Sequence, residues 1–206
     1  MDLFVLLCIG FVLGITGAMI PGPLTLFTVS ETLKSNKLSG LKAILGHIII
    51  EFVIILAILL GFQTLLTSRE FLLVMSIIGG LALVVMGVLL FWNAAKMKLS
   101  SIKNYPTSAK GLVLGGVFFS AVSPGFLVWW TSIGISTLAR AFLFGTVGVI
   151  ILMLGHWLAD VLWYGFLSYA TDKGKAYLSD KLYQNILRFF SMGLVALGIR
   201  FIIFNK

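Results

Sequence analysis

Six long apolar runs follow one another along the chain, each bounded by charged or polar residues. They cover Leu3 to Val29, Leu41 to Leu66, Phe71 to Ala95, Leu112 to Ile135, Ala141 to Ala170 and Ile186 to Phe204. Each run has about the 20 residues that a helix needs to cross the hydrocarbon core of a bilayer. The pattern therefore predicts an all-α membrane protein with six transmembrane helices, separated by short linkers such as Ser136–Arg140 and Thr171–Asn185.

Composition narrows the class further. Of the 206 residues, 60% are hydrophobic and 11% are charged, whereas a soluble domain has roughly 25% charged residues. We expect one transmembrane domain over residues 1–206, with no appended catalytic or nucleic-acid-binding domain. Cys8, the single cysteine, lies inside the first apolar run, so neither an intrachain disulfide nor a thiolate metal site is expected. The partners expected from composition are the lipid bilayer and a small solute, not nucleic acid.

The basic residues predict an orientation. Of the 15 Lys and Arg residues, four lie on the side of the second and fourth linkers and the C-terminus: Arg69, Arg140, Arg200 and Lys206. The other eleven lie in or beside the linkers that follow the first, third and fifth runs. Because basic residues collect on the cytosolic side of membrane helices, we expect these three linkers in the cytosol, both termini outside it, and the protein in the inner (plasma) membrane. The basic residues expected in the cytosolic linkers account for the net charge of +8.

The two halves of the chain carry three matched signals. Ala18-Met19-Ile20-Pro21-Gly22-Pro23 in the first run corresponds to Ala121-Val122-Ser123-Pro124-Gly125-Phe126 in the fourth. Gly46-His47 followed by Glu51 corresponds to Gly155-His156 followed by Asp160, and Gly87 corresponds to Gly198. Because each half contains three helices, an odd number, the second half must cross the bilayer in the opposite sense to the first. The sequence thus predicts two inverted three-helix repeats, about 1–95 and 111–206, joined by a cytosolic linker at about 96–110; inverted repeats are typical of secondary transporters.

The proline motifs predict a break in the first and fourth helices. Proline removes a backbone donor and clashes with the preceding turn, and glycine permits non-helical angles. Pro21-Gly22-Pro23 and Ser123-Pro124-Gly125 should each end one helix and start another. A new helix N-terminus favours an anion such as a carboxylate. The alternative is that the prolines are simple packing kinks, which are common in membrane helices.

Two acids inside apolar runs are the main candidates for chemistry. His47 and Glu51 are spaced i, i+4 and share one helix face, and His156 and Asp160 repeat this arrangement. A carboxylate at such depth costs at least about 2.5 kcal/mol and needs a partner or a wet cavity. Glu51 and Asp160 are therefore predicted to bind an ammonium group or a proton, with the histidines as their partners. The alternative is a structural carboxylic acid bonded to a neighbouring histidine or indole.

These motifs resemble the lysine exporter superfamily (LysE/RhtB type) of amino-acid efflux permeases. The resemblance rests on Pro21-Gly22-Pro23, the glycines Gly46, Gly80 and Gly87, and the second break at Pro124, and it extends over essentially the whole chain. It implies a six-helix inner-membrane exporter of amino acids, driven by protons or membrane potential. Members often have Asn-Pro in the fourth helix, where this chain has Ser123-Pro124.

The sequence as a whole indicates a secondary transporter that exports an amino acid or a similar small zwitterion, with no cofactor and no enzymatic activity. One alternative is a divalent-cation exporter, because two histidines and two carboxylates can form an N2O2 site. A less favoured one is a haem protein with His47 and His156 as axial ligands. A non-transporting membrane subunit is disfavoured by the paired acids. The substrate, the coupling ion and the oligomeric state, including a homo-oligomer, stay open.

Overall fold

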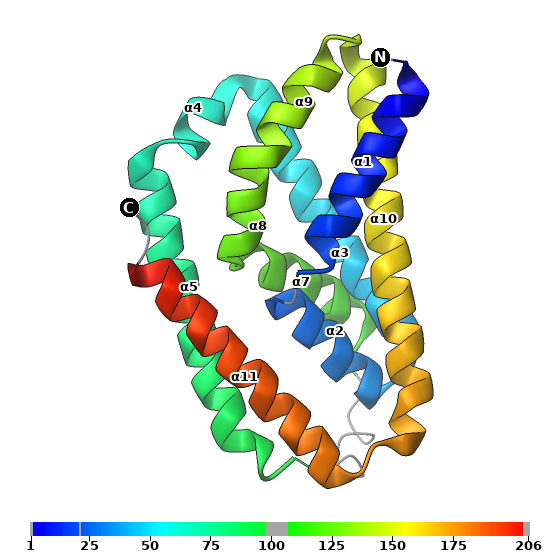
Figure 1. Ribbon diagram of the computed structural model, residues 1–206, viewed down its shortest axis with the longest axis vertical. Helices are drawn as coiled ribbons and strands as arrows, with labels where there is room; N and C mark the ends of the chain where they lie inside the picture. Colours follow the sequence, from blue (N-terminus) through cyan, green and yellow to red (C-terminus); the bar gives the residue numbers. More distant parts are fainter. Residues whose placement is uncertain (1, 21, 98–106, 204–206) are drawn as a thin grey trace.

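A computed structural model describes residues 2–20, 22–97 and 107–203, and every regular element in these ranges is helical. Figure 1 shows their arrangement. The α-helices are α1 (Leu3–Ala18), α2 (Pro23–Lys34), α3 (Leu38–Ala57), α4 (Gln63–Leu66), α5 (Arg69–Ala94), α7 (Ala109–Ala121), α8 (Pro124–Trp129), α9 (Ile135–Phe142), α10 (Gly145–Gly174) and α11 (Asp180–Ile203). Two π-helical segments, η1 (Ile58–Phe62) and η2 (Trp130–Gly134), and one 3-10 turn, η3 (Lys175–Tyr177), extend them.

The described helices supply up to six membrane crossings. Four are single helical stretches that are long and apolar enough to span a bilayer: α3 with η1, which has a kink at Gly61, α5, α10 with η3, and α11. The other two are bent pairs, because α1 and α2 meet at 75° and α7 meets the helical stretch Pro124–Phe142 at 63°. The predicted all-α membrane class is confirmed, and both bends fall at the predicted proline motifs.

Several predicted boundaries are wrong. The expected linker Ser136–Arg140 lies within α9, and the chain turns only before Gly145, whose φ of +66° is in the left-handed region that favours glycine. Likewise α10 continues to Gly174 through the start of the expected linker Thr171–Asn185, and α11 already begins at Asp180. Charged residues mark where a helix leaves the bilayer, but the helix itself continues beyond them.

Glycines bring three pairs of helices into backbone contact. α1 packs along α10, α3 along α7, and α5 along α11. A Cβ atom on Gly155 would lie 2.1 Å from the Leu7 carbonyl oxygen, and one on Gly46 would lie 2.0 Å from that of Val113. Gly46 and Gly155 are the matched glycines of the two halves, so the two crossings are alike. These pairings agree with two inverted units; the repeat itself stays a prediction.

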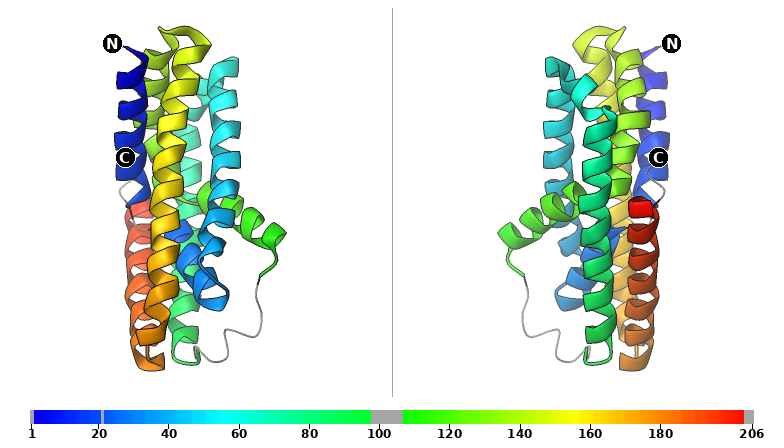
Figure 2. Two further views of the ribbon diagram at one scale, coloured as in Figure 1. Left: turned by 90° about the vertical axis from the view of Figure 1, so that its right-hand side faces the viewer. Right: turned by 90° about the vertical axis from the view of Figure 1, so that its left-hand side faces the viewer.

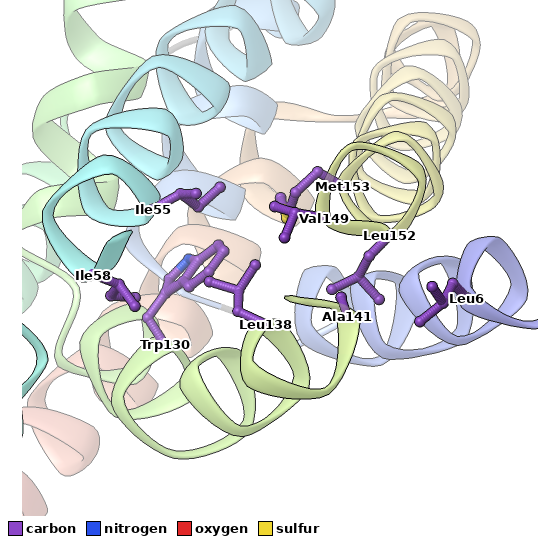
Figure 3. Close-up of a cluster of buried hydrophobic side chains, with 9 residues drawn as sticks. All are labelled: Leu6, Ile55, Ile58, Trp130, Leu138, Ala141, Val149, Leu152 and Met153. Carbon is purple, nitrogen blue, oxygen red and sulfur yellow. The ribbon is translucent and has the colours of Figure 1, made fainter. Parts of the chain in front are cut away.

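The upper half of the molecule in Figure 1 is held by an apolar cluster, which we call the apolar plug. Its members come from α1, α3, η1, η2, α9 and α10, and all are buried (Figure 3): Leu6, Ile55, Ile58, Trp130, Leu138, Ala141, Val149, Leu152 and Met153. Trp130 is its largest side chain and is 2% exposed. A space of only about 10 Å³ is left beside Trp130, Leu138, Leu152 and Met153.

In the lower half, α2 fills the space between two layers of helices. Leu26 and Leu33 pack with buried residues of α5 and α11, and Leu24 packs with Ala43 and Tyr164 of α3 and α10. Figure 1 shows α2 lying between α11 and α10, and Figure 2 shows α7 inclined to the long helices. Both ends of α2 are therefore fixed by neighbours from both halves of the chain.

Candidate functional site

A cavity of about 160 Å³ lies where the two helix breaks meet. The α1–α2 break, α3, the α7–α8 break and α10 all contribute to its wall, together with Leu83, Leu197 and Phe201 from the α5–α11 pair. Eight of the ten predicted site residues line it: Gly22, Pro23, His47, Glu51, Ser123, Gly125, His156 and Asp160. Pro124 packs against Gly79 instead, and Pro21 lies outside the described residues.

The first break leaves a helix N-terminus open toward the cavity. Gly22 is the N-cap of α2, its backbone is extended, and no side chain caps the helix; Pro23 is the first helical residue. The first amides of a helix have no partner within it, and here they belong to Leu24 and Thr25, which both line the cavity. This end of α2 can accept an anionic group.

The second break is closed by its own side chain. Ser123 is the N-cap of α8, and its hydroxyl accepts a hydrogen bond from the Phe126 amide at 3.4 Å. The serine that departs from the Asn-Pro pattern thus satisfies one of the orphaned donors of that helix start. The two breaks are at matching positions in the sequence, but only the start of α2 lacks a side-chain cap.

Glu51 lies at the centre of the polar network. Its Oε1 is 2.9 Å from His156 Nε2 and 3.3 Å from His47 Nε2, and its Oε2 accepts a hydrogen bond from Trp157 Nε1 at 3.0 Å. Glu51 is 1% exposed, so these contacts replace the water that the carboxylate loses on burial. His47 also bonds through Nδ1 to the Ser120 hydroxyl at 2.8 Å.

Asp160 is buried but less completely paired. It is 2% exposed, and its Oδ2 lies 3.5 Å from His156 Nε2, with no hydrogen-bond partner among the residues that the structure describes. Both Asp160 and His156 line the cavity. An unsatisfied buried carboxylate oxygen is costly, so a cationic group or a water molecule in the cavity would stabilise it.

The sequence predicted the residue types of this site but not all of their partners. His156 was expected to pair with Asp160 on its own helix, yet it lies closer to Glu51, so the pairing crosses between the two halves of the chain. Ser120 was missed as a partner, and the indole that the structural alternative allowed for is that of Trp157. Ser120 is 73 residues from His47, and Trp157 is 106 residues from Glu51. Only a comparison of the polar positions in the two halves of the chain could have suggested these contacts.

The cluster also has the donor set for a divalent cation. One ligand atom each from His47, Glu51 and Asp160 lies within 4.8 Å of the others. A haem does not fit, because both histidines approach the same oxygen of Glu51 and the cavity is smaller than the roughly 300 Å³ at which drug-sized ligand pockets begin.

Comparison with known proteins identifies one match. A family model described as "LysE type translocator" covers residues 15–204. No curated protein and no solved structure matches the chain.

Proposed function

The chain belongs to the LysE type translocator family, and from this membership together with the central cavity we propose that it exports an amino acid or a similar small zwitterion across the cytoplasmic membrane. The driving force is the proton gradient or the membrane potential. The family resemblance stated from the proline and glycine motifs is confirmed by the match, and the multi-pass membrane class agrees with the helices. The choice of an amino acid as substrate is our proposal.

One observation carries this proposal: the cavity combines an uncapped helix start with a carboxylate oxygen that has no hydrogen bond among the described residues. The amides of Leu24 and Thr25 suit a substrate carboxylate, and Asp160 Oδ2 suits an ammonium group. A zwitterion needs both at once, whereas a simple anion or cation needs one. The cavity volume of about 160 Å³ favours a solute with few non-hydrogen atoms.

The two acids receive different roles in this proposal. Both oxygens of Glu51 already have protein partners, so Glu51 with His47 and His156 handles the coupling proton. Asp160 binds the ammonium group, because its Oδ2 has no hydrogen bond among the described residues. His156 contacts both acids and connects the two events.

Transport of a defined mixture tests the proposal. Everted membrane vesicles would receive an equimolar mixture of the twenty ¹⁴C-labelled L-amino acids, with the vesicle lumen made acidic. We expect label to accumulate, and competition by single unlabelled amino acids then names the substrate. If no label accumulates in vesicles that contain the folded protein, the proposed substrate class is wrong.

The predicted orientation has its own test. In a Cys8→Ala background, a cysteine at Ser179 should resist a membrane-impermeant thiol reagent added to intact cells, and a cysteine at Ser68 should react. Ser68 precedes α5, and Ser179 lies between η3 and α11. The reverse labelling pattern would place both termini in the cytosol.

The second candidate is a divalent-cation exporter, favoured by the three converging ligand atoms of His47, Glu51 and Asp160. Imidazole and carboxylate together suit ions such as Zn²⁺. The same vesicles, given external ⁶⁵Zn²⁺ in place of the amino acids, distinguish the two candidate functions. Accumulation of zinc without any amino acid would select this candidate.

A further inference from the structure

A row of polar side chains leads away from the cavity along α10. Asp160, Tyr164, Ser168 and Asp172 are spaced four residues apart, so they share one face of the helix. The first three are buried, with Ser168 fully inaccessible. Asp160 and Tyr164 line the cavity, and Asp172 is partly exposed at the other end, near the C-terminal end of the helix. The row therefore extends from the cavity to the lower surface.

Three threonines of α2 run beside this row. Thr25, Thr28 and Thr32 are all buried on one side of α2. Thr25 is hydrogen-bonded to Tyr164, and the Thr32 hydroxyl lies 3.0 Å from the Ser168 hydroxyl. We call these five residues, Thr25, Thr28, Thr32, Tyr164 and Ser168, the hydroxyl seam. It joins the two helices at two heights between the cavity and the surface.

The surface end of the seam is tied together by charge. Lys175 forms an ion pair with Asp172 and also donates a hydrogen bond to the Ser35 carbonyl at 3.2 Å, just beyond the end of α2. This end lies where the charge count predicts the cytosol. The seam is thus bounded by Asp160 at the cavity and by Asp172 at the surface.

One member of the seam is unpaired. Thr28 is 0% exposed, and its Oγ1 has no hydrogen-bond partner among the described residues. Thr28 lies one turn from Thr25 and one from Thr32. Side chains one turn apart on a helix are about 6 Å apart between their Cβ atoms, so a proton route through Thr28 needs a bridging water on each side of it. Buried waters occupy sites of this kind, beside polar groups that lack a protein partner.

We propose that the hydroxyl seam conducts protons between the central cavity and the surface at Asp172. This inference rests on the proposed function, because it adds a route for the proton that drives export. Each hydroxyl and each bridging water accepts a proton from one neighbour as it donates its own to the next. One proton therefore leaves at one end for each that arrives at the other, and no seam residue keeps a charge. The burial of all five side chains leaves no passage for an amino acid.

A purely structural role is the competing explanation, since hydroxyl pairs often join membrane helices. Two modes of transport distinguish a proton route from a purely structural role. Liposomes containing the purified full-length protein would be given the mixture of twenty ¹⁴C-labelled L-amino acids either in exchange for the same unlabelled mixture, which moves no net protons, or against an imposed pH gradient. Variants Thr28→Val and Ser168→Ala remove one seam hydroxyl each without touching the cavity wall.

We expect both variants to lose about tenfold in gradient-driven uptake, to retain wild-type exchange, and to keep their melting temperature close to that of the wild type. Ser191→Ala is the matched control, because Ser191 is also 0% exposed but lies on α11 against α5. It should leave both transport modes unchanged. Pyranine trapped in the liposomes reports the accompanying proton movement.

Three results would overturn the inference. Wild-type gradient-driven uptake in both variants would show that the seam carries no protons. An equal fall in both modes, with a lower melting temperature, would show that it only holds the helices together. If the wild-type protein exchanges amino acids but does not respond to the pH gradient, it is still an exporter, but it has no proton route. Absence of exchange in the wild type is a different failure, because it removes the proposed function itself.

Discussion

The hydroxyl seam and the apolar plug each combine residues from both halves of the chain, yet their chemistry is opposite. On α10, the residues after Asp160 at successive turns are Tyr164 and Ser168. On α3 and η1, the buried residues after Glu51 are Ile55 and Ile58. The helix start after the first break continues into buried threonines, whereas the one after the second continues into Trp130 and Leu138.

The two regions differ in their side chains rather than in being built from packed helices. Gly46 and Gly155 each bring a pair of helices into backbone contact, α3 with α7 and α10 with α1. The side chains differ, because buried hydroxyls lie between α2 and α10, whereas the plug is built from apolar side chains around the Trp130 indole.

The largest expected effect is on the plug. Leu138→Ala removes a side chain that is 3% exposed within it, and such truncations cost about 2–5 kcal/mol. We expect a clear fall in the melting temperature of the detergent-solubilised protein. Leu143→Ala is the control, because Leu143 is 84% exposed at the end of α9. Equal melting temperatures for the two variants would mean that the plug is not tightly packed.

The next largest effect is on Glu51. Glu51→Gln keeps the size of the side chain but removes the charge that His156 and Trp157 contact. A hydrogen bond to a charged group contributes about 1.5–3 kcal/mol, which corresponds to roughly 10- to 150-fold in rate. We expect export in vesicles to fall in this range and to lose its pH dependence. A structural, already neutral acid predicts instead a wild-type rate and pH profile.

Asp160→Asn sharpens the comparison between the two acids. It removes a charge whose Oδ2 has no hydrogen bond within the described chain, so we expect weaker substrate binding with little change in thermal stability. If Asp160→Asn lowers the melting temperature as much as Glu51→Gln does, the two acids are equivalent and their assigned roles are wrong.

A smaller effect is expected at the helix break. Gly22→Ser introduces a capping hydroxyl at the uncapped start of α2, where the nearest atom to a new Cβ is 4.0 Å away. Relative to glycine, an N-cap serine is worth only a few tenths of a kcal/mol, and it competes with a substrate carboxylate for the same amides. We expect a KM raised by up to about twofold, with folding retained. Gly22→Ala adds the Cβ without the hydroxyl, and a KM that rises equally in both variants would exclude the anion site.

The smallest effect is expected on the stability of the seam. Thr28→Val replaces an unpaired buried hydroxyl by a methyl group of similar size, so the change in unfolding free energy should stay within about 1 kcal/mol. The reverse change in the plug, Ile55→Thr, buries a new hydroxyl and should cost about 1–3 kcal/mol. Thermal unfolding of both variants measures the difference. Equal losses would mean that the two regions are equally dry.

The sequence by itself determined the membrane class and the positions of both helix breaks. These features are local: apolar run length matches the bilayer thickness, and proline acts on its own turn. The buried acids were also visible, because Glu51 and Asp160 interrupt apolar runs. The matched halves predicted that these features would come together, and the cavity contains most of them.

Only the tertiary structure decided which groups are partners. His156 bonds to Glu51 across 105 residues of sequence, and Ser168 pairs with Thr32 across 136. Such contacts depend on which helices cross and at what height, and apolar periodicity carries no information on either. The uncapped start of α2, the capped start of α8 and the contrast between seam and plug follow from the same cause. Local sequence sets where a helix breaks, but packing between distant helices sets what each polar group meets.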